Sequence, residues 1–165
     1  MDSIHENQTW ELVELPVGRK PLPYKWVFQY KFVSDSDNPK YKAQLVAKGF
    51  KQERGVDYDE IFLPIVKMTT LRLLLGIMVT EDLELEQLDV KTTFLHIDLE
   101  EDIYMSQPEG FTTMREESLL ICQLKKILYS LKQAPTMWYH KFHSYIQQFG
   151  YHRFDFDPCM YTRGR

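Results

Sequence analysis

The feature that most constrains the fold is a strict alternation of side chains over residues 25–33. Aromatic residues fill the even positions from 26 to 32, and lysine, valine or glutamine fill the odd ones. A period of two predicts a β-strand that is buried on one face and solvated on the other. Residues 34–39 are rich in turn formers, and residues 41–50 predict a second strand. We therefore expect a hairpin, and its lysines make it a basic ribbon over residues 25–51.

Shorter patterns predict further strands and two helices. One helix is expected from a threonine cap at Thr69 or Thr70 to about Val79, with leucines along one side. Another should begin at Pro135 and end by Gly150. Because no regular β-α-β order occurs, the prediction is the α+β class. The other expected strands are 10–15, 84–94 with Leu83, Leu85 and Leu88 buried, 99–105, 119–125, and 151–162 with an interruption near Pro158.

Charge is distributed very unevenly along the chain. The net charge of −4 argues against a nucleic-acid partner, because a basic excess is the usual footprint of one. By segment, however, residues 19–54 carry +6, residues 81–110 carry −9 and residues 125–165 carry +5. Such runs are most often solvated surface. The alternative is two basic surfaces that hold a polyanion around a centre that binds cations.

Several protein classes are excluded by simple features. The two cysteines, Cys122 and Cys159, are too few for a disulfide scaffold and lack metal-binding spacing. The N-terminus has neither the basic nor the apolar region of a signal peptide. The longest apolar stretch, residues 73–79, is far shorter than the roughly 18 residues of a membrane span. We expect a soluble intracellular chain with free thiols.

Two pairs of side chains offer weak metal-binding candidates. His140 and His143 lie three residues apart on a predicted helix, but no third ligand accompanies them and a surface or capping role is the commoner one. Asp155 and Asp157 could hold a divalent ion, or they could simply form a turn before a proline.

Asp89 is the stronger candidate. It lies between apolar positions of a predicted strand, where a carboxylate costs free energy unless it is paired or bound to a metal. Lys91 could pair with it. A hard cation such as Mg²⁺ takes oxygen ligands and needs few protein carboxylates when phosphates supply the rest. No glycine-rich phosphate loop and no Gly-x-Ser-x-Gly motif accompanies it.

Seven short blocks occur in one order over almost the whole chain. They are WELV at 10–13, KWVF at 25–28, YKAQLVAKGF at 41–50, LEQLDVKTTFLH at 85–96, QPEGF at 107–111, LYSLKQAP at 128–135 with Trp138 and Tyr139, and DPC at 157–159. Together they resemble the reverse transcriptase domain of copia-type retrotransposon Pol polyproteins.

This resemblance implies a right-hand polymerase fold with fingers and an incomplete palm. Residues 1–83 would be mostly fingers, 84–118 the first palm segment with Asp89, and 119–165 a return through fingers and palm. Such a domain joins a primer 3′-hydroxyl to a nucleoside triphosphate with the help of Mg²⁺. The family also has a Tyr-x-Asp-Asp hairpin that supplies further carboxylates, and this sequence contains no such motif. We therefore expect an N-terminal fragment that is inactive alone.

The resemblance also implies roles for six residues. Asp89 would be a catalytic carboxylate that binds Mg²⁺, and the Val90 carbonyl would be a secondary ligand. Phe94 would lie below the sugar and exclude a 2′-hydroxyl, while Lys42 would approach the triphosphate. The last two nucleotide-binding candidates are Tyr129 and Lys132, which lie in the segment that would support template and nucleotide.

Some positions depart from the family pattern. Gln44 stands where arginine is common, and Thr93 stands where alanine is common. Ser130 and Ile97 each replace a common glycine, which matters wherever the backbone needs a positive φ. Residues 136–137, Thr-Met, replace a common Arg-Gln pair.

The partners implied by the resemblance are an RNA template, a DNA primer and deoxynucleoside triphosphates, without a membrane. The ribbon at 25–51 and the segment at 125–165 are the candidate nucleic-acid surfaces. The implied location is the cytoplasm, in a virus-like particle for an intact element, or the nucleus. Two alternatives remain open: a catalytically dead retrotransposon remnant that at most binds nucleic acid, and an unrelated protein-interaction domain.

Overall fold

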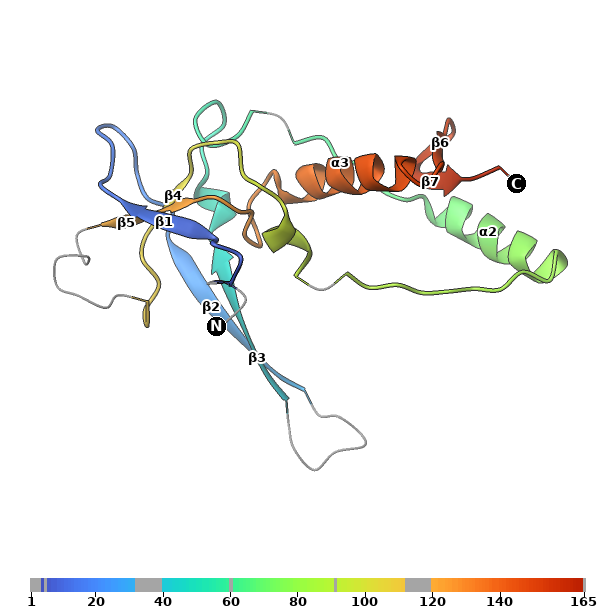
Figure 1. The fold of residues 1–165 in the computed structure, drawn as a ribbon, viewed down its shortest axis with the longest axis horizontal. Coiled ribbons are helices and arrows are strands. Elements are labelled where there is room, and N and C mark those ends of the chain that lie inside the picture. Colours follow the sequence, from blue (N-terminus) through green and yellow to red (C-terminus); the bar gives the residue numbers. More distant parts are fainter. Residues whose placement is uncertain are drawn as a thin grey trace. The chain divides into compact units, whose positions relative to one another are not determined.

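The computed structural model describes residues 4, 6–31, 40–59, 61–90, 92–111 and 120–164. Figure 1 shows small antiparallel sheets together with helices, so the predicted α+β class is confirmed. The chain divides into two compact units. The first unit is Met1–Ile61 with Thr92–Ala134, and the second is Phe62–Lys91 with Pro135–Arg165.

A three-stranded sheet forms the core of the first unit. Its strands are β1 (Trp10–Val13), β5 (Ile121–Leu124) and β4 (Tyr104–Met105), in the order β1-β5-β4. Cys122 of β5 lies opposite Leu12 on one side and Met105 on the other. The predicted strands at 10–15 and 119–125 are confirmed with shorter bounds, and that at 99–105 is reduced to two residues. The largest fully buried side chains of this core include Ile103, Met105, Leu124, Ile127, Leu128 and Leu131.

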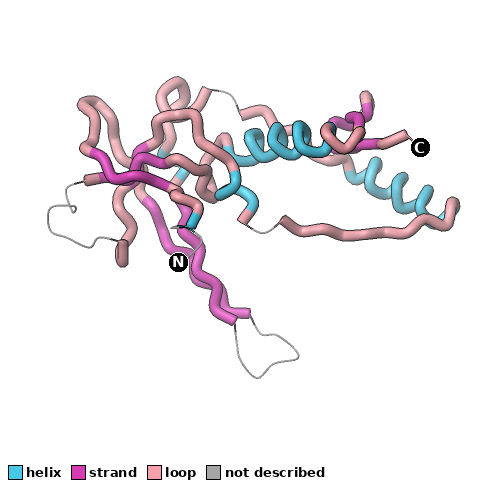
Figure 2. The backbone as a smooth tube through the Cα atoms, in the orientation of Figure 1, coloured by secondary structure: helices cyan, strands magenta, loops and turns pink. Residues whose placement is uncertain are grey.

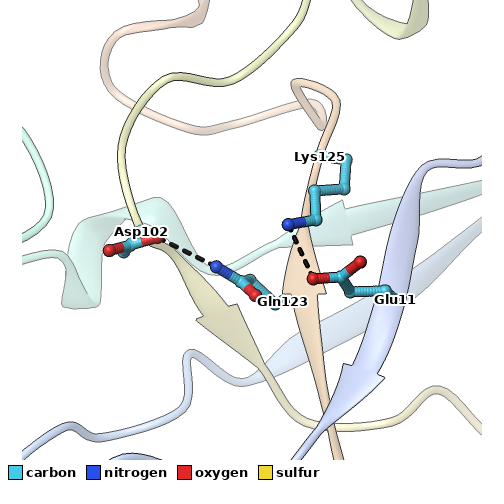
Figure 3. Close-up of polar contacts among 4 residues, drawn as sticks. All are labelled: Glu11, Asp102, Gln123 and Lys125. Atoms are coloured by element: carbon cyan, nitrogen blue, oxygen red, sulfur yellow. Dashed lines mark hydrogen bonds and ion pairs between the residues drawn. The ribbon is translucent and has the colours of Figure 1, made fainter.

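Polar contacts fasten the exposed side of this sheet (Figure 3). Lys125 Nζ lies 2.7 Å from Glu11 Oε1, and Gln123 Nε2 donates to Asp102 Oδ1 at 2.9 Å. Both members of the ion pair are about half exposed, so the pair adds at most about 1 kcal/mol to stability. The apolar core therefore holds this sheet together, and the polar contacts mainly align its strands.

The predicted hairpin is confirmed as β2 (Tyr24–Lys31) and β3 (Lys40–Ala47), drawn as a long antiparallel pair in Figure 2. Its predicted turn at 34–39 lies outside the described residues. The base of the hairpin is buried, with Ala47 fully inaccessible. The expectation of one buried aromatic face is wrong at Phe28 and Tyr30, which are 76% and 49% exposed, and Phe32 lies outside the described residues. The ribbon extends past the core (Figure 1), so these rings stay accessible to solvent.

A close backbone approach joins the base of the ribbon to residues 128–134. Gly49 opens the 3₁₀ helix η1 (Gly49–Lys51), and a Cβ placed on it would lie 1.8 Å from the Ser130 carbonyl oxygen. Next to this approach, the buried Gln52 side chain donates to Gln133 Oε1 at 3.0 Å and accepts the Lys132 backbone N–H at 2.8 Å. Together these contacts hold residues 128–134 against the base of the ribbon.

In the second unit, α2 (Met68–Thr80) is tied to the hairpin of β6 (His152–Phe154) and β7 (Asp157–Thr162). Asp157 Oδ2 accepts the backbone N–H of Lys67 at 3.4 Å, and Cys159 Sγ donates to the Pro64 carbonyl at 3.3 Å. The predicted threonine cap is wrong: Lys67 is the N-cap residue, and its own side chain caps nothing. The predicted leucine stripe of α2 is present in the helix, but none of its residues is buried.

The other elements of the second unit follow the pattern of the sequence more closely. Helix α3 (Ala134–Gln147) includes Pro135 in its first turn, as expected. Gly150 follows the end of this helix with φ +78, and its N–H donates to the Gln147 carbonyl at 3.0 Å. The single strand predicted at 151–162 is instead two strands, because the chain turns at residues 155–156 and not near Pro158.

The largest correction concerns residues 83–90. The strand predicted at 84–94 with buried leucines is wrong here, because residues 83–90 contain no regular secondary structure and Leu85 and Leu88 are 70% and 80% exposed. A strand needs a neighbour to satisfy its backbone groups, and none of the described strands pairs with this segment. Farther along, residues 93–96 form the 3₁₀ helix η2 (Thr93–His96) instead of the end of a strand.

Candidate functional site

A hollow of about 210 Å³ lies in the first unit, where the ribbon meets residues 128–129. Lys42 and Gln44 line it from one face of β3, since side chains two apart in a strand share a face. A bridge between Val46 and Tyr129 holds the two segments side by side. The other lining residues are Ile4, Ala43, Leu45, Thr92, Leu95, Leu128 and Tyr129. The hollow is therefore mostly apolar, with one ammonium group at its wall.

Two of the predicted nucleotide-binding residues, Phe94 and Tyr129, are in contact, and Tyr129 lines this hollow. The rings of Phe94 and Tyr129 are 4.9 Å apart between centroids and nearly perpendicular. An edge-to-face pair of this kind stabilises by about 0.5–1.5 kcal/mol beyond burial alone. Phe94 is positioned by η2, which follows Thr92 in a left-handed conformation at φ 51. The local fold thus brings Lys42, Tyr129 and Phe94 into one neighbourhood.

Lys132 lies nearby but is held by other groups. Its Nζ donates to the Tyr58 hydroxyl at 2.9 Å and lies 4.6 Å from the centre of the same ring. A cation over a ring at this distance is worth roughly 0.5–2 kcal/mol. Lys132 is not among the residues that line the hollow. In this structure its side chain fastens residues 128–134 to Tyr58, and its assignment to nucleotide binding stays a prediction.

Asp89 and Val90 belong to the second unit, in the irregular segment of residues 83–90. Among the residues that the structure describes, no three His, Cys, Asp or Glu side chains form a group that could hold a metal ion. Mg²⁺ prefers six oxygen ligands in near-octahedral geometry. The described residues therefore do not fit a complete Mg²⁺ site, and the metal-binding roles of Asp89 and Val90 stay predictions.

The two histidines, the weaker metal-binding candidates, contact aromatic side chains. His143 Nδ1 lies 3.1 Å from the Tyr161 hydroxyl, and its ring stacks on Tyr139 with centroids 6.1 Å apart. Burial, followed by the hydrogen bond with Tyr139, raises the pKa of Tyr161 to about 12. These contacts place His143 in an aromatic cluster between α3 and β7, while His140 is exposed beside it.

Asp157 has a structural role as well. It is buried, and its carboxylate accepts the Cys159 backbone N–H at 3.0 Å in addition to the N–H of Lys67. The hydrogen bond from the Thr70 side chain is the largest cause that lowers the pKa of Asp157, followed by the one from Cys159. Thr70 lies in the first turn of α2, so this carboxylate caps a helix that begins 90 residues earlier. No local signal in the sequence could have revealed that pairing.

A second hollow, of about 440 Å³, was not anticipated from the sequence. Its cations are Arg19, Lys20 and Lys51. The guanidinium of Arg19 donates to the backbone carbonyls of Asp102 at 2.6 Å and Val56 at 3.1 Å. Two acidic residues, Glu53 and Asp57, line the same hollow, so its three cations are accompanied by two anions. The basic run from 19 to 54 was the available signal, but it did not single out Arg19.

Of the two positions where this sequence lacks a common glycine, only one has a positive φ, and serine adopts it there. Ser130 has φ 70, a conformation that costs a residue with a side chain about 1–2 kcal/mol. Ile97 has an ordinary extended backbone, φ −111, and is buried. Strain at Ser130 therefore lies directly beside Tyr129 and the first hollow.

Comparison with known proteins decides the family. Residues 7–165 match the family described as Reverse transcriptase (RNA-dependent DNA polymerase). The chain belongs to this family. This confirms the resemblance to copia-type reverse transcriptases and excludes an unrelated interaction domain.

Several curated relatives of this reverse transcriptase chain are Pol polyproteins from transposons. It is 53% identical over 163 residues to the Retrovirus-related Pol polyprotein from transposon TNT 1-94 of Nicotiana tabacum, covering 99% of this chain and 12% of that protein. Identity to the Pol polyproteins from transposons RE1 and RE2 of Arabidopsis thaliana is 42% over 146 residues and 40% over 162 residues. These matches cover 88% and 96% of this chain and 10% and 11% of those proteins. The chain thus spans about a tenth of their length, and no solved structure matches it.

Proposed function

We propose that the chain is the fingers and part of the palm of an RNA-directed DNA polymerase from a copia-type long-terminal-repeat retrotransposon. In this proposal residues 1–83 are mostly fingers, 84–118 carry Asp89 in the palm, and 119–165 return through both. The family match over residues 7–165 supports it. The acting partners of the complete domain are an RNA template, a DNA primer and deoxynucleoside triphosphates, in the cytoplasm or nucleus. None of the described helices has the length and hydropathy to cross a bilayer.

The observation that carries a nucleotide-binding role is that Lys42 and Tyr129 line one hollow. An ammonium group is a compact cation that binds phosphate oxygens without demanding a fixed geometry. The apolar remainder of the lining and the Phe94–Tyr129 ring pair offer surfaces for a sugar and a base. The hollow therefore has the mixture of a few polar groups in an apolar wall that is typical of small-molecule sites.

The nucleotide affinities of two lysine-to-alanine variants test this role. Lys42→Ala should weaken binding of dTTP by about 10- to 100-fold, the loss expected when a hydrogen bond to a charged group worth ~1.5–3 kcal/mol is removed. Lys25→Ala is the matched control, because Lys25 is an exposed cation of the same ribbon that does not line the hollow. Calorimetric titration measures both affinities. Equal losses in the two variants would contradict a specific role for Lys42.

We further propose that Asp89 and the Val90 carbonyl contribute ligands for Mg²⁺ in a complete domain. The described residues do not fit the whole site, so the chain alone should not extend a primer. The second candidate function is a remnant that only binds nucleic acid. Both candidates predict no primer extension by this chain alone, so extension on an RNA template with Mg²⁺ is measured in a complete domain that contains it. Extension that Asp89→Asn abolishes would refute the remnant.

A further inference from the structure

The β2–β3 ribbon carries aromatic rings on one face. Antiparallel pairing places Trp26 opposite Leu45, Phe28 opposite Ala43 and Tyr30 opposite Tyr41. Directly opposed residues share a face of a sheet, and residues two apart along a strand do so as well. The aromatic face is therefore made of Trp26, Phe28, Tyr30 and Tyr41.

The rings of this face are solvent-accessible and ordered relative to one another. Phe28 and Tyr41 are 76% and 80% exposed, whereas Trp26 is half-buried. Trp26 and Phe28 are nearly parallel, with centroids 6.3 Å apart, and the Tyr30 and Tyr41 centroids are 5.3 Å apart. Rings held on a hydrogen-bonded ladder need little further ordering when a flat partner binds.

The inner end of the aromatic face is anchored in the core of the first unit. Trp26 stacks on Phe111 with centroids 6.3 Å apart, and Phe111 makes an edge-to-face contact with Trp10 of β1 at 5.2 Å. The row thus begins in packed structure at Trp26, and the rings beyond it are exposed. Large accessible apolar surface on such a scaffold is typical of a binding site.

Charge indicates which partner this face fits. Residues 24–31 and 40–47 include lysines and no aspartate or glutamate. Lys25 and Lys42 are exposed on the opposite face, and long side chains can reach past the edge of a two-stranded ribbon. A basic ribbon with accessible ring faces fits a polyanion that presents unstacked flat groups. Unpaired nucleic acid has this chemistry, whereas a duplex keeps its bases stacked inside.

We propose that the aromatic face is a stacking platform for the unpaired bases of single-stranded nucleic acid. The four rings of this face are not among the residues that line the hollow at Lys42 and Gln44. The proposal rests on the proposed function in one respect only, that the chain binds nucleic acid. Each base that stacks on a ring should strengthen binding by a factor of about 5 to 100.

Fluorescence anisotropy with labelled 12-nucleotide dT and rU strands tests the platform in the full chain. Phe28→Ala and Tyr41→Ala should each weaken binding about 5- to 100-fold, while Phe28→Trp should keep it. The salt dependence of binding should not change, because stacking releases no counterions. Phe62→Ala is the matched control, since Phe62 is a 69% exposed ring outside both basic segments, and it should bind normally.

A strand of the same length without bases isolates stacking from charge. The wild type and Phe28→Ala should bind this abasic strand equally, and Lys25→Ala should weaken all strands while lowering the salt slope by about 0.7. Unchanged binding of dT and rU by both alanine variants would overturn the platform and leave nucleic-acid binding intact. A Phe28→Ala defect that persists on the abasic strand would also overturn it. Absence of binding to any strand would overturn both the platform and the proposed function.

Discussion

Replacing Gly49 with alanine probes the contact that holds the candidate site together. The added Cβ would lie 1.8 Å from the Ser130 carbonyl oxygen and 2.8 Å from its carbonyl carbon, and both atoms belong to the backbone. Ordinary contact begins near 3.4 Å, so η1 and residues 128–131 must separate by roughly 1.5 Å. No side-chain rotation can relieve this clash.

The magnitude follows from what the separation disrupts. Overpacking in a tight core costs about 1–3 kcal/mol. The same movement stretches the two hydrogen bonds of the buried Gln52 side chain, and each buried polar group left unpaired costs about 1–3 kcal/mol. We therefore expect Gly49→Ala to lower the free energy of unfolding of the first unit by about 3 kcal/mol or more.

Urea denaturation followed by tryptophan fluorescence measures this change, because Trp10 and Trp26 lie in the first unit, while Trp138 reports on the second unit. The control is Gly76→Ala in α2, where nothing lies within 4 Å of the added carbon. Alanine is favoured over glycine in a helix, so this variant should be stabilised by about 0.5–1 kcal/mol. A Gly49→Ala variant within about 0.5 kcal/mol of the wild type would refute the packing argument.

Two further stability predictions concern residues beside the sites. Ser130→Gly should raise the free energy of unfolding by about 0.5–1 kcal/mol, since it relieves a positive φ at some cost in chain entropy, and a lower melting temperature would contradict this. Asp157 has a lowered pKa in the fold, so its contribution to stability is present above the ordinary value of 3.8 and is lost as the pH falls through the folded value. Asp157→Asn should remove this part of the acid transition, as followed by the helical circular dichroism signal between about pH 5 and pH 2; an unchanged transition would show that the carboxylate does not cap α2.

The sequence predicted local elements well because their signals are local. Alternation located the hairpin, and Pro135 with Gly150 marked the region of α3. The prediction of burial was wrong for the periodic apolar segments, because burial also depends on an element that packs against them. The leucines of α2 and of residues 83–90 have the spacing of buried residues, yet they are exposed in the described structure.

Non-local contacts explain the remaining differences between the sequence-based prediction and the structure. The capping of α2 by Asp157 and the approach of Gly49 to Ser130 join positions more than 80 residues apart, and no spacing rule connects them. Within the candidate site, motif resemblance singled out Lys42, Phe94 and Tyr129, and the structure brings these three together. The motif resemblance did not predict the hydrogen bond between Lys132 and Tyr58.

The central claim is that the hollow at Lys42 and Tyr129 binds a nucleotide, and amide chemical shifts of the ¹⁵N-labelled chain test it most directly. Titration with dTTP should shift the signals of Gln44, Thr92 and Tyr129, which line the hollow, and Lys42→Ala should suppress those shifts. Signals around Phe62 in the second unit should stay in place. Shifts that avoid the hollow, or that persist unchanged in Lys42→Ala, would contradict the account.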